Sequence, residues 1–154
     1  MNSRLVGLTA ACLTIAACAT PMPERVEGAA GAPLVNTQWR LTQLGDQVVS
    51  HAAGDSGGAN AVGLQLQAQN LRVTGFGGCN RMFGGYSLDG DQLKFGQVGA
   101  TKMACLDESR MRLEQGYFDM LSRVARWKIT GSTLTLLDNE GTILGTFVVG
   151  EATE

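Results

Sequence analysis

The chain has 154 residues, a length that allows one domain and no more. Its formal charge of −2 argues against nonspecific nucleic-acid binding, which requires a basic face. With 21 glycines, 3 prolines and 6% aromatic residues, the composition is typical of many bends and short elements. It does not favour a protein built from long helices.

The first 17 residues are typical of a bacterial lipoprotein signal peptide. Arg4 precedes an apolar run over 5–17 that is too short for a membrane-spanning helix. The run ends in Ile-Ala-Ala before Cys18, which fits a lipobox whose cysteine accepts a diacylglycerol. An ordinary secretory signal that leaves Cys18 unmodified is the alternative. Cys12 is a poorer candidate because Thr9 stands where an aliphatic residue is needed.

We expect acyl chains on Cys18 to anchor the mature chain to a membrane of the bacterial envelope. Ala19 is not Asp, which is typical of lipoproteins sorted to the periplasmic face of the outer membrane. Residues 18–36 hold all 3 prolines and favour a flexible tether. The domain itself is then expected over 37–150.

Alternation of apolar and polar residues predicts a series of short strands. They are expected at 37–44, 64–67, 71–74, 86–88 and 93–95, followed by an extended stretch over 98–105. Asp89 and Gly90 separate two alternating segments, which is a hairpin signal. Further strands are expected at 126–130, 134–137 and 143–149.

Between the last two groups of strands the apolar period becomes helical. The helix is expected from Asp107, a suitable N-cap, to about Ala125. Gly116 weakens it by about 1 kcal/mol without abolishing the pattern. Glu114 falls within the apolar arc, where a carboxylate must be paired or hydrogen-bonded. We hypothesise that Glu114 docks the helix onto the glycine-rich segment 75–86. In the alternative, the helix is rotated or frayed near Gly116 and Glu114 reaches solvent.

The segment 75–86 holds five glycines in twelve residues and predicts a tightly bent β corner. Cys79 lies in it, and Cys105 follows 26 residues later. Because a signal peptide directs the chain to an oxidising compartment, a disulfide between them is the leading interpretation. Free thiols, a redox pair and a metal site remain alternatives. A redox pair usually has a C-x-x-C spacing, and His51 alone adds too few ligands for a metal.

The only histidine, His51, lies in a polar loop over 50–63. It could act as a general base, but no nucleophile motif or carboxylate cluster accompanies it, so we expect a solvated loop residue. The chain also lacks the G-x-S-x-G, H-E-x-x-H, phosphate-loop and calcium-loop motifs. The sequence therefore predicts a protein that is not an enzyme and binds no cofactor or metal.

These motifs together resemble the META domain of HslJ-like bacterial envelope lipoproteins, over roughly 37–149. The resemblance rests on W-x-L at 39–41, G-x-x-G-C-N-R-x-x-G-x-Y at 75–86, T-x-M-A-C at 101–105, E-x-x-x-F from 114, and a closing L-x-L strand. Besides the two cysteines, the motif residues are Gly78, Asn80, Arg81, Gly84, Tyr86, Thr101, Met103 and Glu114.

The resemblance implies a mainly β fold: a small incomplete antiparallel β-barrel of about eight strands, with one helix over its open side. Periodicity alone indicates a strongly curved sheet and does not separate a barrel from a sandwich. Glu114 belongs to the family pattern, and we expect its partners to be Arg81, the amides around 79–80, or the Thr101 hydroxyl. For function, the resemblance implies a link to heat-shock or stress responses, without an established chemistry.

Two non-enzymatic functions are therefore considered. One is an anchored domain in the envelope stress response or envelope maintenance. The other is a binding module, similar to pilotins or hydrolase inhibitors, that holds a hydrophobic ligand or a peptide in the curved sheet. An apolar cavity beside the helix would favour binding, and a filled core would favour the first function. We expect a monomer whose partners are the membrane, through Cys18, and an envelope protein or hydrophobic ligand.

Overall fold

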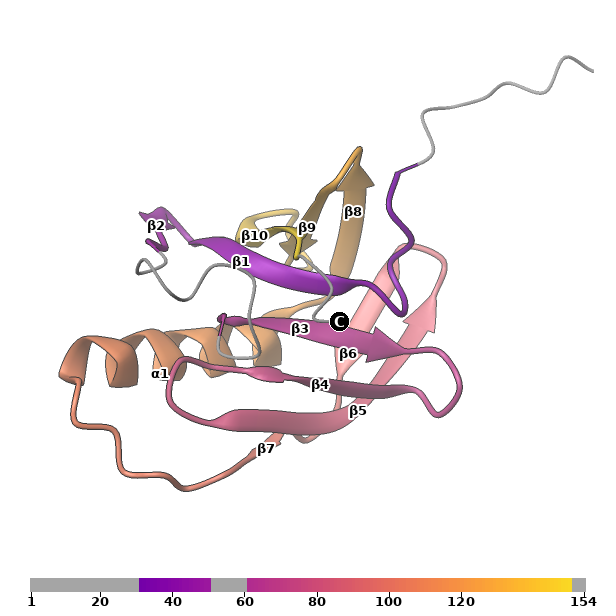
Figure 1. Ribbon diagram of the computed structural model, residues 1–154. Helices are drawn as coiled ribbons and strands as arrows, with labels where there is room; N and C mark the ends of the chain where they lie inside the picture. Colours follow the sequence, from indigo (N-terminus) through magenta and orange to yellow (C-terminus); the bar gives the residue numbers. More distant parts are fainter. Residues whose placement is uncertain (1–30, 51–60, 151–154) are drawn as a thin grey trace, which may run out of the picture.

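The computed structural model describes residues 31–50 and 61–150, which form a ten-stranded sheet and one helix (Figure 1). The strands are β1 (Gln38–Leu44), β2 (Gln47–Val48), β3 (Gly63–Gln67), β4 (Arg72–Phe76), β5 (Arg81–Asp89), β6 (Gln92–Phe95), β7 (Gly99–Ala100), β8 (Arg126–Thr130), β9 (Thr133–Leu137) and β10 (Ile143–Val149). The helix α1 (Glu108–Arg123) lies between β7 and β8 in the sequence.

Eight of these strands form a small antiparallel barrel. Their order is β10-β9-β8-β6-β5-β4-β3-β1, and β1 pairs with β10 from Trp39↔Val149 to Leu44↔Gly145. The joint between β6 and β8 is a single residue pair, so the barrel is least complete there. The two-residue strands β2 and β7 lie beside β1 and β5. The predicted mainly β fold, a small barrel with one helix, is confirmed.

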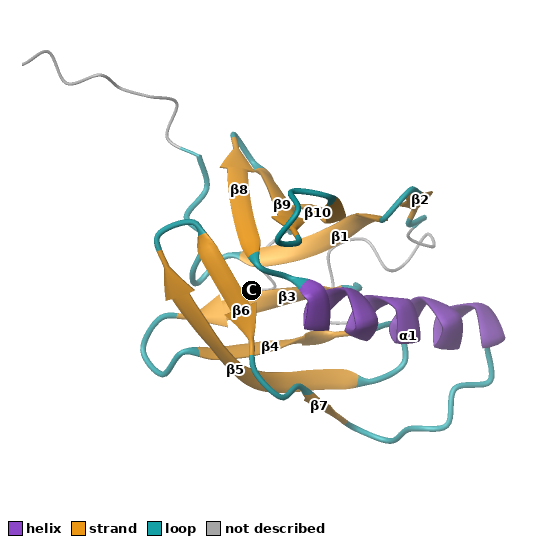
Figure 2. Cartoon of the chain, turned by 180° about the vertical axis from the view of Figure 1, so that it is seen from behind, coloured by secondary structure: helices purple, strands orange, loops and turns teal. Residues whose placement is uncertain are grey.

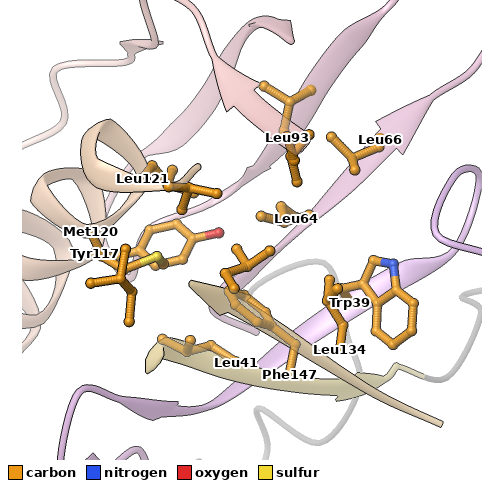
Figure 3. Packing of buried hydrophobic residues seen from close by; sticks show 14 of the residues in the cluster. Trp39, Leu41, Leu64, Leu66, Leu93, Tyr117, Met120, Leu121, Leu134 and Phe147 are labelled. Atoms are coloured by element: carbon orange, nitrogen blue, oxygen red, sulfur yellow. The ribbon is translucent and has the colours of Figure 1, made fainter. Parts of the chain in front are cut away.

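The barrel interior is filled by its own side chains (Figure 3). Fully buried residues come from strands all around the barrel: Trp39, Leu41, Leu64, Leu66, Val73, Leu93, Leu134, Leu136 and Phe147. Tyr117, Met120 and Leu121 of α1 enter the same cluster. Burying one side chain of this size contributes about 1.5–3 kcal/mol, so this cluster is the main source of stability.

Helix α1 covers one end of the barrel, where it lies against β1, β6 and β10 (Figure 2). It begins at the predicted N-cap Asp107, whose Oδ1 accepts hydrogen bonds from the amides of Ser109 (2.8 Å) and Arg110 (3.3 Å). Close packing explains the glycine at position 116, because a Cβ there would lie 3.2 Å from Cδ2 of Leu44. The helix therefore remains regular despite its glycine.

The opposite end of the barrel is closed by residues 32–36, which the sequence assigned to the tether. The amide of Ala32 donates to the carbonyl of Gly131 (3.0 Å). Leu34 is buried, and its carbonyl accepts a hydrogen bond from the indole of Trp39 (2.9 Å). The tether boundary at 36 is therefore wrong, since the open barrel end buries Leu34 and orders the residues beside it.

Two strands differ in extent from the prediction. β5 begins at Arg81, within the glycine-rich segment, because Phe76 to Arg72 of β4 pair with it along that part. Of the extended stretch 98–105, only Gly99–Ala100 pairs as a strand. Beyond it, the amide of Thr101 donates to the carbonyl of Arg81, and the amide of Met103 donates to the side chain of Asn80.

Candidate functional site

The glycine-rich segment forms a tight turn between β4 and β5, at the barrel end covered by α1. Phe76 pairs with Arg81, so residues 77–80 make the turn, and the amide of Gly77 donates to the carbonyl of Asn80 (2.9 Å). Gly78 has a backbone φ of 124°, a value that residues other than glycine rarely adopt. The predicted β corner is thus a four-residue hairpin turn, the 77–80 turn.

Gly77 allows α1 to approach this turn closely. A Cβ at Gly77 would lie 2.9 Å from Cγ and Oε2 of Glu114 and 3.1 Å from Cζ of Phe118. Separations this short are below van der Waals contact, so a larger residue would displace the side chains of Glu114 and Phe118 from the turn. The glycine therefore belongs to the contact between helix and turn.

Glu114 docks α1 onto the 77–80 turn through three hydrogen bonds. Its Oε2 accepts from the backbone amides of Cys79 (3.0 Å) and Asn80 (2.6 Å), and its Oε1 accepts from Nδ2 of Asn80 (2.7 Å). Bonds to an ionised acceptor are stronger than neutral ones. Of the expected partners, the turn amides are the ones used. The Arg81 amide instead donates to the Thr101 hydroxyl, and that hydroxyl donates to Oδ1 of Asn80.

Asn80 connects the turn to the segment that follows β7. It is 8% exposed, and its Oδ1 accepts from the Thr101 hydroxyl (3.0 Å) and the Met103 amide (2.7 Å). The Thr101 hydroxyl in turn accepts from the amide of Arg81 (3.2 Å). Because Nδ2 is bonded to Glu114, this nearly buried side chain is well satisfied and links three segments of chain.

Cys79 and Cys105 form a disulfide beside this network, with their Cα atoms 5.7 Å apart. The bond joins the 77–80 turn to the residues just before α1. In the chain-entropy model, a loop of this length contributes about 3–4 kcal/mol to the free energy of unfolding. Among the described residues, no group of three His, Cys, Asp or Glu side chains could hold a metal ion.

An open groove of about 590 Å³ lies over the disulfide. It is lined by Phe76, Gly78, Cys79, Arg81, Met103, Ala104, Cys105, Leu106, Asp107 and Arg110. Met103 and Leu106 are 67% and 101% exposed. Large apolar side chains gathered at one exposed hollow are typical of interaction surfaces.

The polar rim of the groove carries more positive than negative charge. Arg110 pairs with Asp107 at 3.9 Å, whereas Arg81 is exposed at the start of β5. The Ser109 hydroxyl and the amides of Arg110 and Ser109 hold the pKa of Asp107 below its usual value, so this carboxylate is ionised at neutral pH. Arg81 therefore supplies a positive charge in excess of the ion pair.

Two motif residues, Gly84 and Tyr86, lie in β5 outside this groove. Gly84 pairs with Val73 of β4. The Tyr86 hydroxyl donates to the carbonyl of Gln67 (3.2 Å), and burial raises the pKa of Tyr86. These two residues make contacts within the barrel, whereas the other motif residues lie around the disulfide.

The predicted lipidation site Cys18, the rejected candidate Cys12 and the loop residue His51 lie outside the described residues. Their assignments stay predictions. Within residues 31–50 and 61–150, no helix has the length and apolar character required to cross a membrane.

Sequence reasoning missed two features of the site. It identified Asn80 as a motif residue but not as the link between Glu114 and Met103, because that link depends on a non-local approach of three segments. It also missed the exposed Leu106, since a single apolar residue in a loop gives no periodic signal. The apolar residues on both sides of Cys105 were the available hint.

Together, these features define a small β-barrel domain that is closed by a helix and braced by a disulfide. The sequence matches the META domain family over residues 32–150, and the chain belongs to this family. The match begins at the residue where the ordered barrel closure begins, in agreement with the corrected domain boundary.

Solved structures show the same fold. An NMR structure of a protein from Burkholderia xenovorans is 26% identical with a TM-score of 0.61, covering 85% of this chain and 100% of that one. A second NMR structure is 21% identical with a TM-score of 0.57, covering 75% and 91%. A DUF4847 family protein from Bacteroides vulgatus is 10% identical with a TM-score of 0.51, covering 78% and 96%. A search of curated proteins found no match.

Proposed function

We propose that this chain is a lipid-anchored envelope protein whose META domain acts without catalysis, in the envelope stress response or in envelope maintenance. The observation that carries this proposal is that the polar groups of the site are engaged in internal hydrogen bonds. The Glu114 carboxylate accepts three hydrogen bonds, and Oδ1 of Asn80 accepts two. A general base must reach the proton it removes from a substrate, whereas these acceptors are engaged in holding the helix to the turn.

The sequence supports a lipid anchor. A lipobox ending at Cys18 follows a short apolar run, and acylation there would attach the domain to a membrane without a spanning helix. Ala19 after the cysteine favours sorting to the outer membrane of a diderm envelope, where the domain would face the oxidising periplasm. An oxidising compartment of this kind also suits the disulfide between Cys79 and Cys105.

Membrane fractionation with matched cysteine variants tests the anchor. We expect the wild-type chain and Cys12→Ser to partition with membranes, and Cys18→Ser to be released or left unprocessed. A wild-type chain found soluble in the periplasm would contradict the proposal.

Complementation of a deletion strain under heat or detergent stress tests the role. We expect wild-type protein to restore growth and Cys18→Ser to fail. A variant at the hydrogen-bonded carboxylate, Glu114→Gln, should restore growth in proportion to the amount of folded protein. Loss of function in fully folded Glu114→Gln would instead indicate a chemical role for the carboxylate.

A binding module is the second candidate function, and the groove over the disulfide favours it. The concave side of the sheet is occupied by its own side chains, so a ligand would bind outside the barrel. The exposed Met103 and Leu106 provide an apolar contact surface beside the helix.

A further inference from the structure

We propose that residues 101–104 and the groove over the disulfide form a docking edge for an extended peptide that carries a carboxylate next to an aliphatic side chain. This inference rests on the binding function proposed above and adds the chemical class of the partner. Three observations carry it: an unpaired backbone edge, an apolar surface beside that edge, and an unpaired positive charge.

The backbone edge follows from the hydrogen bonds of alternate residues. The amide of Thr101 donates to the carbonyl of Arg81 (3.0 Å), and the amide of Met103 donates to Oδ1 of Asn80 (2.7 Å). In an extended segment, successive amides point to opposite sides. The amide of Lys102, between these two, therefore points away from the 77–80 turn.

This outer edge is exposed and has no hydrogen-bond partner within the part of the chain that the structure describes. Lys102 and Ala104 are both exposed, and β7, which precedes them, pairs only with β5 in that same part. A free strand edge can accept another extended chain through main-chain hydrogen bonds. The disulfide at Cys105 and the bond to Asn80 hold the segment in place, so little ordering is required on binding.

The apolar surface beside the edge selects an aliphatic side chain. Met103 and Leu106 are exposed, and Phe76 of β4 lines the same groove. Methionine adapts its shape to different partners, which suits a surface that receives a flexible peptide. In peptides bound by strand addition, alternate side chains enter such pockets and give specificity.

The charge selects a carboxylate. The Arg81 side chain lines the groove and is exposed, and among the described residues it forms no ion pair. A guanidinium at the edge of an apolar hollow favours a carboxylate because it can donate two parallel hydrogen bonds. The chain as a whole has a formal charge of −2, so the positive charge at this rim is opposite in sign to the net charge of the protein.

The position of the groove favours a peptide over the anchoring bilayer. The groove lies at the barrel end covered by α1, whereas the described chain enters the domain at Ala32, beside Gly131 at the other end (Figure 1). A tether that enters at the other end does not hold the groove against its own membrane. An anionic bilayer and a second copy of this chain are the competing occupants.

Selection from a library of random 12-residue peptides displayed on phage tests the proposal. The full chain, isolated from the envelope in a neutral detergent, is immobilised through a C-terminal tag. We expect enrichment of peptides with Asp or Glu next to Leu, Ile or Val. Absence of enrichment over tag-only surfaces would overturn the proposal.

Paired variants then separate backbone, charge and apolar contributions. Lys102→Pro removes the outward amide and should weaken binding of an enriched peptide about tenfold, whereas Lys102→Ala should leave affinity within about threefold. Arg81→Ser should also weaken binding about tenfold, and Arg112→Ser on α1 should leave it unchanged. Ala104→Pro repeats the backbone test if Lys102→Pro lowers the melting temperature.

Three results would overturn the proposal. Equal binding by Lys102→Pro and Lys102→Ala would exclude strand addition. Arg81-dependent cosedimentation with phosphatidylglycerol vesicles, without peptide binding, would assign the groove to a bilayer. A concentration-dependent dimer lost in a Met103→Ser, Leu106→Ser double variant would assign it to a second copy. Fractionation of Cys18→Ser is measured separately, so failure of the peptide test leaves the anchoring proposal standing.

Discussion

Substitution of Glu114 should be among the most destabilising changes available outside the barrel core. Glu114→Ala removes the acceptor of three hydrogen bonds, two from backbone amides of the 77–80 turn and one from Asn80. A typical hydrogen bond contributes about 0.5–1.5 kcal/mol net, and more when one partner is charged. Because Glu114 is half-buried and water can replace part of the loss, we expect about 2–4 kcal/mol.

The more informative change is Glu114→Gln, which keeps the size of the side chain. All three contacts of Glu114 are donors, so one end of a glutamine would place an NH2 group against another donor. Rotation of the Asn80 amide would relieve that clash but would break its bonds to Thr101 and Met103. We therefore expect Glu114→Gln to lose nearly as much stability as Glu114→Ala.

Urea unfolding under non-reducing conditions measures both changes with the disulfide intact. The matched control is Glu108→Gln, because Glu108 lies on the same helix in an exposed pair with Arg112 at 3.6 Å. Such pairs contribute about 0.3–0.5 kcal/mol. A Glu114→Gln protein as stable as wild type would show that the side chain only fills space. Equal, small effects of Glu114→Ala and Glu108→Gln would refute the docking altogether.

Three further changes test other parts of the structure. Cys79→Ser should lower the free energy of unfolding by about 3–4 kcal/mol, and native protein should show no free thiol at Cys79 or Cys105; rapid labelling of both would contradict the bond. Tyr117→Phe should stabilise the protein by about 1–2 kcal/mol, because the buried hydroxyl points toward Leu64 and has no hydrogen-bond partner among the described residues (Figure 3). A loss of stability would reveal a bonded hydroxyl. The amide of Thr142, then that of Glu140 and the charge of Arg123, lower the pKa of Asp138. The stability that Asp138 contributes should be complete above its unfolded pKa of about 3.9 and fade as pH falls through the lower folded value, so the stability gap to Asp138→Asn should close in acid.

The elements themselves could be predicted from the sequence where local patterns suffice. Alternation located most of the strands, and the helical period with Asp107 as N-cap located α1 almost to the residue. The arc that contains Glu114 correctly indicated a side chain in contact with the sheet, because helix geometry fixes which residues share a face. Met111 shows the limit of that projection, since it is 47% exposed at the first turns of the helix.

What could not be predicted depends on contacts between distant segments. Pairing of β1 with β10 closes the barrel, but no local pattern distinguishes that pairing from a sandwich edge. Leu34 lies among residues that look like a linker and is buried only because the barrel end is open to it. The groove is likewise a product of assembly, since Met103 and Leu106 meet Arg81 only once the disulfide and Asn80 have positioned their segment.

Asn80 and Glu114 hold residues 101–104 against the 77–80 turn and leave the outer edge of this segment free. Amide hydrogen exchange, measured residue by residue, tests this arrangement. In the wild-type protein, the amide of Met103 should be protected and the neighbouring amide of Lys102 should exchange at close to the unfolded rate, and in Glu114→Gln the protection at Met103 should fall sharply. Equally fast exchange of both amides in the wild-type protein, or unchanged protection of Met103 in Glu114→Gln, would contradict it.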